Sequence, residues 1–113
     1  MSIQRWVKEL PISVTVCDSR GVILEMNDRA GEVFKKEGGQ KLVGSNVLDC
    51  HPEPARSRLE RLLESGERNV YMILKEGRRK LIYQVPWFEE GSYQGFVELA
   101  LEMPDEVPTF LRK

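Results

Sequence analysis

Cysteine and histidine are scarce in this sequence. Its 113 residues contain two cysteines, Cys17 and Cys50, and one histidine, His51. A structural zinc site built only from Cys and His takes four ligands, so these residues alone cannot form one. Two cysteines that lie far apart in the chain also predict no disulfide framework. We therefore expect free thiols and a cytoplasmic protein.

An excess of positive charge is also lacking. The 17 Lys and Arg residues are balanced by 18 Asp and Glu residues, which gives a formal net charge of −1. Nucleic-acid binding needs a basic surface that neutralises phosphates, so we expect no direct contact with nucleic acid. No apolar run approaches the roughly 20 residues of a membrane-spanning helix. The first ten residues have no apolar core of a signal peptide, and we expect no membrane segment.

The length and composition predict one compact domain. Hydrophobic residues make up 41% and charged residues 31% of the chain, as in ordinary globular proteins. Residues 1–10 form an amphipathic pattern, because Ile3, Trp6, Val7 and Leu10 recur at helical spacing. We expect this helix to pack on its own sheet or against a second copy in a dimer. We assign residues 11–103 to the domain and residues 104–113 to an extended tail.

Alternating apolar and polar residues mark the strands, and apolar residues at helical spacing mark the segment between them. The expected order is strands 12–17 and 22–26, a helix from 27 to about 36, single-turn helical pieces within 41–50, a helix from 52, and strands 69–74, 79–88 and 96–101. Pro86 places the fourth strand at an edge or a bulge. This order predicts an α+β fold, a five-stranded antiparallel sheet covered on one face by short helices, with any ligand pocket between the two layers.

These elements and several of their residues resemble a PAS domain. The opening hairpin carries Asp18, Gly21 and Asn27 at the spacing of that family, and Leu42-Val43-Gly44 is similar to the step before its long helix. The resemblance extends over residues 10–102. Cys50-His51-Pro52 resembles a bacterial signalling subgroup that has Cys-His-Pro at this step. The resemblance implies a PAS-like sheet and a role in sensing or protein contact.

The same step excludes one class of photosensor. Flavin-binding LOV domains, which are PAS members, carry Gly-x-Asn-Cys, and the thiol of that motif adds to the flavin. Here Gly44-Ser45-Asn46 is followed by Val47. The resemblance therefore implies no photochemical thiol, while non-covalent flavin binding stays open.

Cys50 and His51 are the predicted site residues with reactive side chains. His51 is a candidate axial ligand for haem, since imidazole is the commonest such ligand. The alternative is that His51 caps or packs the start of the long helix. Cys50 is a candidate redox-sensing thiol, because a helix N-terminus favours the thiolate. The alternative is a small buried apolar residue. An adjacent Cys-His pair does not form a catalytic dyad, and we expect no enzyme activity.

Three aromatic residues, Phe34, Tyr83 and Trp87, complete the predicted cofactor-binding set. Alternation places Tyr83 and Trp87 on one face of the fourth strand. If that face points inward, they line or fill the pocket; if it points outward, they form an apolar patch that marks an interface. In a ligand-free dimerisation module, Trp87, Tyr83 and Phe34 would fill the cavity.

The sequence therefore predicts a bacterial PAS sensor or interaction module that works by binding. We expect a small ligand or cofactor to bind in the pocket. Its binding would be relayed through a homodimer to a signalling partner or a fused effector, with regulation of transcription as one possible output. The alternatives are a ligand-free dimerisation module and a haem or thiol redox sensor that uses His51 and Cys50. Haem, a weaker case for flavin, and no cofactor at all stay open.

Overall fold

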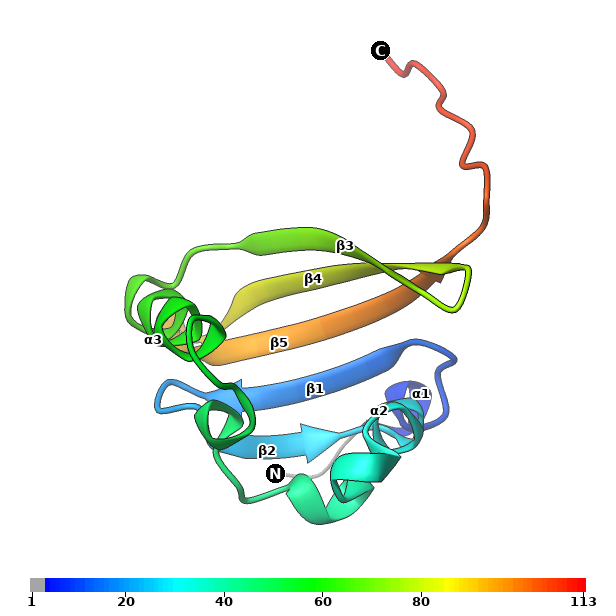
Figure 1. The fold of residues 1–113 in the computed structure, drawn as a ribbon. Helices are drawn as coiled ribbons and strands as arrows, with labels where there is room; N and C mark the ends of the chain where they lie inside the picture. Colours follow the sequence, from blue (N-terminus) through cyan, green and yellow to red (C-terminus); the bar gives the residue numbers. More distant parts are fainter. Residues whose placement is uncertain (1–3) are drawn as a thin grey trace.

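The computed structural model describes residues 4–113. One five-stranded antiparallel sheet, in the order β2-β1-β5-β4-β3, forms the body of the molecule (Figure 1). Its strands are β1 (Ser13–Asp18), β2 (Ile23–Met26), β3 (Asn69–Lys75), β4 (Arg78–Glu89) and β5 (Ser92–Met103). The helices are α1 (Arg5–Lys8), α2 (Asp28–Val33) and α3 (Ala55–Ser65), with the 3₁₀ turns η1 (Lys35–Glu37), η2 (Gly39–Leu42) and η3 (Val47–Cys50). The α+β fold expected from the sequence is confirmed.

The opening hairpin is held by the side chain of Asp18. One carboxylate oxygen, Oδ1, accepts hydrogen bonds from the backbone N–H groups of Arg20 and Val22, both at 2.9 Å. An aspartate that bonds the backbone two residues ahead is a common way to fix a turn. Gly21 follows at a φ of +93°, which an L-residue with a side chain rarely adopts. The turn expected at Asp18–Gly21 is therefore present.

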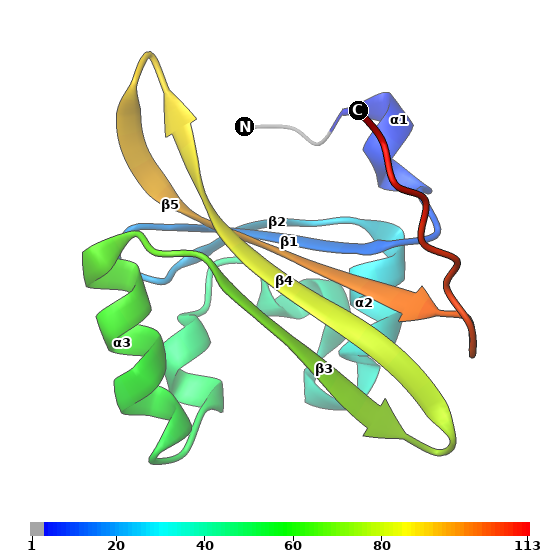
Figure 2. The same ribbon diagram turned by 90° about the horizontal axis from the view of Figure 1, so that it is seen from above.

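The helices lie on both sides of the sheet, but unequally. Figure 2 shows α2 and α3 on one side of the sheet, and α1 with the C-terminal tail on the other. Two groups of buried side chains join the sheet to α2 and α3. Cys17, Leu63 and Phe96 form one of them, and Ile23, Met26 and Ala30 form the other. We call the side covered by α2 and α3 the inner face, and the opposite side the outer face.

Two details of the final strands differ from the expectation. β5 begins at Ser92 rather than near residue 96, because Glu90 and Gly91 make a tight turn with φ values of +51° and +82°. β4 is an interior strand between β5 and β3, but its pairing with β3 ends at Gln84, so Pro86 lies where β4 is paired on the β5 side only. A bulge does interrupt its pairing with β5, between Trp87 and Phe88.

The part of the chain beyond β5 carries no helix or strand, and residues 104–113 are exposed. Within residues 4–113, no helix has both the length and the apolar character needed to cross a membrane.

Candidate functional site

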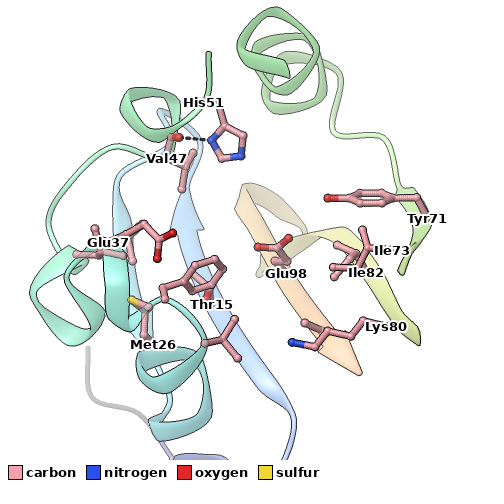
Figure 3. Close-up of a pocket in the computed structure, with 15 residues that line it drawn as sticks. Thr15, Met26, Glu37, Val47, His51, Tyr71, Ile73, Lys80, Ile82 and Glu98 are labelled. Carbon is pink, nitrogen blue, oxygen red and sulfur yellow. Dashed lines mark hydrogen bonds between the residues drawn. The ribbon is translucent and has the colours of Figure 1, made fainter. Parts of the chain in front are cut away.

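A cavity of about 320 Å³ lies between the inner face of the sheet and the helical segment. All five strands contribute to its lining, together with α2, the turn after it and the three 3₁₀ turns (Figure 3). Its apolar wall includes Ile23, Met26, Phe34, Leu42, Ile82 and Ala100. A smaller hollow of about 50 Å³ shares Thr15, Val47, His51 and Glu98 with it. The pocket is therefore where the sequence predicted it.

A row of polar side chains crosses the sheet at this cavity. Strand register aligns Thr15 of β1 with Glu98 of β5, Glu98 with Gln84 of β4, and Gln84 with Asn69 of β3. The Asn69 amide nitrogen donates to Gln84 Oε1 at 2.8 Å, and Gln84 Nε2 donates to Glu98 Oε1 at 3.2 Å. Asn69 thereby orients the Gln84 amide so that its N–H group faces the carboxylate. We call these four residues the polar row.

Burial is the main influence on the carboxyl group of Glu98. Removing a carboxylate from water disfavours its charged form, so the pKa of Glu98 is raised above its ordinary value. The hydrogen bond from Gln84 and the charge of His51 act in the opposite direction. A second carboxylate oxygen, Oε2, has no hydrogen-bond partner among the described residues. This oxygen is available to a bound group.

Thr15 ends the polar row at β1. It is 9% exposed, and within the described part of the chain its Oγ1 is buried with no hydrogen-bond partner. A buried hydroxyl without a partner costs free energy of about 1–3 kcal/mol. Thr15 lines the cavity beside Glu98, so a molecule that binds in the cavity would be able to supply the missing hydrogen-bond partner.

His51 lines the cavity from the segment between η3 and α3. Its Nδ1 lies 2.6 Å from the carbonyl oxygen of Val47, which accepts the hydrogen bond. A carbonyl only accepts, so Nδ1 carries the proton in the neutral ring and Nε2 keeps its lone pair. Figure 3 shows the ring on the same side of the cavity as Glu98 and Tyr71. Nε2 is thus a second acceptor near the carboxylate.

Three further polar side chains border the cavity: Glu37 of η1, Tyr71 of β3 and Lys80 of β4. Figure 3 shows all three directed toward its interior. Burial, followed by the charge of Glu98, raises the pKa of the Tyr71 phenol, and Arg58 opposes that shift. Two carboxyl groups, Glu37 and Glu98, therefore face one ammonium group, Lys80.

The predicted site residues fall into three groups. His51 and Phe34 line the cavity. Tyr83 and Trp87 do not, which corrects the expectation that they line or fill it: Lys80, Ile82 and Gln84 of β4 occupy the inner face, so the alternating pleat turns Tyr83 and Trp87 outward. The side chain of Cys50 lies outside the described part of the structure. Of the five predicted cofactor-binding residues, the structure therefore places two, His51 and Phe34, at the cavity.

The outward residues have other partners. The Trp87 indole Nε1 donates to the carbonyl oxygen of Cys17 at 3.0 Å, and Arg68 donates to the Tyr83 hydroxyl at 3.3 Å. Cys17 itself is buried with a free thiol, and burial raises its pKa. A raised pKa disfavours the reactive thiolate. Among the side chains that the structure describes, no three His, Cys, Asp or Glu residues are grouped to hold a metal ion.

Sequence reasoning missed Glu98, Thr15, Tyr71, Lys80 and Glu37. Glu98 had a usable signal. It is the one charged residue in the run Phe96-Val97-Glu98-Leu99-Ala100-Leu101, and its neighbours Val97 and Leu99 belong to the opposite face. A carboxyl group within so apolar a strand indicates either exposure or a polar partner inside. Thr15, Tyr71 and Lys80 are ordinary residues that strand register brings to the cavity, and Glu37 reaches it from η1.

Comparison with known proteins agrees with this geometry. A family model described as the PAS fold matches residues 7–107. A C-terminal domain from Streptococcus mutans is 24% identical with a TM-score of 0.67, covering 86% of this chain and 79% of that one. The Aer2 receptor of Vibrio cholerae, described as a dual PAS-haem oxygen sensor, is 17% identical with a TM-score of 0.61, covering 82% and 95%.

A sensory box sensor histidine kinase from Vibrio cholerae is 14% identical with a TM-score of 0.61, covering 88% of this chain and 87% of that one. No curated protein matches the sequence. The solved structures share the fold with this chain, and two of them are described as sensory proteins. Because the family model spans most of its length, this chain belongs to the PAS fold family.

Proposed function

We propose that this protein is a sensory module that binds a small ligand in the 320 Å³ cavity and relays its presence by protein contact. The observation that carries the proposal is that two members of the polar row, Thr15 and Glu98, lie on the wall of that cavity. A cavity needed only for packing would be apolar, since an unpartnered polar group on its wall costs free energy. Thr15 Oγ1 is such a group, and Glu98 beside it uses only Oε1 in a hydrogen bond to the protein.

The cavity volume indicates how much of a ligand can be enclosed. If a water molecule takes about 30 Å³ in the liquid, 320 Å³ corresponds to a ligand of about ten non-hydrogen atoms. Most pockets for small molecules combine an apolar wall with a few polar groups that fix orientation. Here Phe34 and Ile82 belong to the wall, and Glu98, Thr15 and His51 are the orienting groups.

The similar proteins support a sensory role. Aer2 is described as an oxygen sensor and another neighbour as a sensor histidine kinase. We infer that this chain likewise acts in bacterial signal transduction, in the cytoplasm and by binding rather than turnover. Its output then passes through a second copy of the chain and a signalling partner, or through a fused effector. Ligand binding would bias the packing of α2, which borders the cavity.

Fragment binding measured by saturation-transfer NMR tests the proposal. We expect fragments of about ten non-hydrogen atoms to bind the wild type, and Ala100→Phe, which fills the cavity from β5, to abolish their binding. The matched control is Ala55→Phe at an exposed position on α3. Circular dichroism establishes that both variants are folded. Absence of any bound fragment, or equal binding by folded Ala100→Phe, would contradict a ligand site in this cavity.

Haem is the second candidate, and His51 is the observation that favours it. Its Nδ1 donates to a backbone carbonyl and leaves Nε2 for a metal, which is the usual arrangement of a ligating histidine. Against this, a porphyrin is larger than a 320 Å³ cavity, and Glu98 and Glu37 border the space it would occupy. The residues present therefore fit haem less well than a small ligand.

The visible absorption spectrum, recorded before and after addition of haem or flavin, separates these candidates. A Soret band that is lost in His51→Ala would favour a haem sensor. A flavin spectrum would instead favour a non-covalent flavin module. We expect neither, and we expect the protein to stay colourless while fragments bind.

A further inference from the structure

We propose that the cavity selects ligands with a cationic or N–H-donating head group, which is held between Glu98 Oε2 and Thr15 Oγ1. This inference rests on the proposed ligand site and adds the chemical class of its occupant. Three observations carry it: the alignment of hydrogen-bond donors behind Glu98, the orphan hydroxyl beside it, and the balance of charge around the cavity.

The two amide side chains on the β3 and β4 side of Glu98 are already hydrogen bonded to each other and to Glu98. Asn69 fixes the Gln84 amide, and Gln84 then donates to Glu98 Oε1. That bond stabilises the carboxylate form and holds it at a set position on β5. Oε2 is left without a partner among the described residues, so it presents lone pairs to the cavity. A ligand donor satisfies Oε2, whereas a ligand acceptor would be repelled by it.

Thr15 and His51 can also accept hydrogen bonds from donor groups of a ligand. Thr15 Oγ1 both donates and accepts, and Nε2 of the neutral His51 ring accepts. The three groups come from β5, β1 and the segment before α3, and all three line the cavity. An amine or amidine presents several N–H donors at once, which suits several converging acceptors.

The charges that face Glu98 favour a cation overall. Glu37 is a second carboxyl group at the cavity, and Lys80 is the opposing ammonium. His51 and Tyr71 are the other titratable groups at the cavity, and the Cys17 thiol is coupled electrostatically to Glu98. The cavity lining therefore contains two carboxyl groups and one ammonium group.

A matched set of phenyl probes tests the proposal: benzamidine as the cation, benzamide as the neutral donor, and benzoate as the anion. Binding to the wild type is followed by ¹H–¹⁵N NMR titration at pH 8, with shifts at cavity residues marking the site. We expect benzamidine to bind at least tenfold more tightly than benzoate, with benzamide between them.

Two variants locate the preference. In Glu98→Gln, which keeps the size of the side chain, we expect the preference for benzamidine over benzoate to fall at least tenfold while benzamide still binds. In Thr15→Val, which removes only the hydroxyl, we expect benzamidine affinity to fall about threefold. The control is Glu102→Gln, at an exposed carboxylate of β5 that pairs with Arg78 at 3.1 Å; its probe order should match the wild type.

The pH dependence gives an independent readout. Because the pKa of Glu98 is raised, a fall in pH protonates Glu98 before an ordinary carboxyl group. A cation prefers the ionised form, so benzamidine affinity should fall as the pH is lowered through that raised pKa, while benzamide affinity changes less. In Glu98→Gln this difference between the two probes should be lost.

The outcomes separate the two proposals. If no probe shifts cavity residues, both the ligand site and the charge preference are overturned. If the probes bind the cavity but benzoate equals or exceeds benzamidine, or if Glu98→Gln keeps the wild-type order, the ligand site stands and the preference for a cationic or donor head group is overturned.

Discussion

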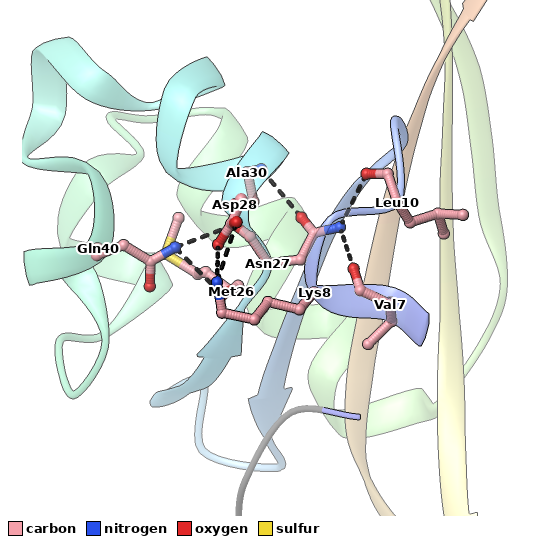
Figure 4. Close-up of polar contacts among 8 residues, drawn as sticks. All are labelled: Val7, Lys8, Leu10, Met26, Asn27, Asp28, Ala30 and Gln40. Carbon is pink, nitrogen blue, oxygen red and sulfur yellow. Dashed lines mark hydrogen bonds and ion pairs between the residues drawn. The ribbon is translucent and has the colours of Figure 1, made fainter. Parts of the chain in front are cut away.

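At the scale of single residues, Asn27 joins three segments of the chain. It is fully buried, and its side-chain oxygen accepts from the backbone N–H groups of Val14 and Ala30, both at 3.0 Å. Its amide nitrogen donates to the carbonyl oxygens of Val7 at 3.0 Å and Ile12 at 2.8 Å. Figure 4 shows this side chain between α1 and the start of α2. One amide therefore caps α2, fixes the start of β1 and holds α1.

Replacing Asn27 by Ala should destabilise the protein by about 3 kcal/mol or more, because several buried backbone groups lose their partners at once. Urea unfolding followed by circular dichroism measures the change. The control is Asn46→Ala, at another N-cap asparagine, which accepts from Leu48 N at 2.9 Å and donates to Arg20 O at 3.0 Å but is only partly buried. We expect about 1 kcal/mol there. Equal losses at the two sites would contradict the role assigned to Asn27.

At the scale of the elements, periodicity was enough to predict each strand but not which side of it faces inward. In β4, Leu81 and Val85 are apolar like the inward Ile82, and Tyr83 presents an aromatic ring, so the pattern of apolar residues does not distinguish the two faces. The outer face of this sheet is apolar as well, and for that reason the sequence left both an inward and an outward face open for Tyr83 and Trp87. The polar row was equally hidden, because it exists only through the register of four strands.

The helical segment was predicted more closely, because its signals are local. Asn27 and Asn46 each accept a hydrogen bond from a backbone N–H within the next three residues, and both precede a helical turn. Gly66 ends α3 in the left-handed conformation. Caps of this kind are readable from sequence, whereas the space that the helices leave over the sheet is not. The location of the cavity was therefore predictable, and its polar wall was not.

Gly95 allows β5 to approach its neighbour β1 closely, at a position where a side chain would block the approach. Its φ is +148°, and a Cβ atom built there would collide with the backbone of Cys17 and Asp18 in β1. Trp87 lies opposite Gly95 in β4 and reaches over it to donate to the Cys17 carbonyl. The absence of a side chain at Gly95 thus allows β1, β5 and Trp87 to meet.

Replacing Gly95 by Ala should therefore cost about 3 kcal/mol or more, since both backbone strain and a backbone collision oppose it. Thermal unfolding measures the change, and Trp87 fluorescence reports whether the indole environment is altered. Gly91→Ala is the control: its φ is also positive, at +82°, but a Cβ there meets nothing within 4 Å, so only strain of about 1 kcal/mol is expected. A smaller loss at Gly95 than at Gly91 would show that the strands can separate freely.

At the scale of the whole molecule, the side of the sheet that carries α1 is less covered than the inner side. Figure 2 places α1 and the C-terminal tail on the outer side. Trp6 of α1 is 72% exposed, and Phe110 and Leu111 of the tail are 72% and 94% exposed. Exposed large apolar side chains are typical of an interface, but Figure 1 shows the end of the tail beyond the β3 edge of the sheet and α1 near the β2 edge, so the two segments do not form one patch. We infer that a second copy of the chain covers Trp6 of α1 in a symmetric dimer.

Removing residues 1–10 should convert this dimer to a monomer, as measured by light scattering over a range of concentrations. Because the deletion also removes the Val7 carbonyl that Asn27 bonds, Trp6→Ser is the sharper variant: it leaves the backbone of α1 in place and removes only the exposed indole. We expect it to weaken dimerisation at least tenfold. Leu74→Ser, at a 76% exposed apolar residue of β3, is the matched control and should leave the dimer unchanged. A dimer that survives the deletion, or one lost equally in Leu74→Ser, would place the interface elsewhere on the molecule.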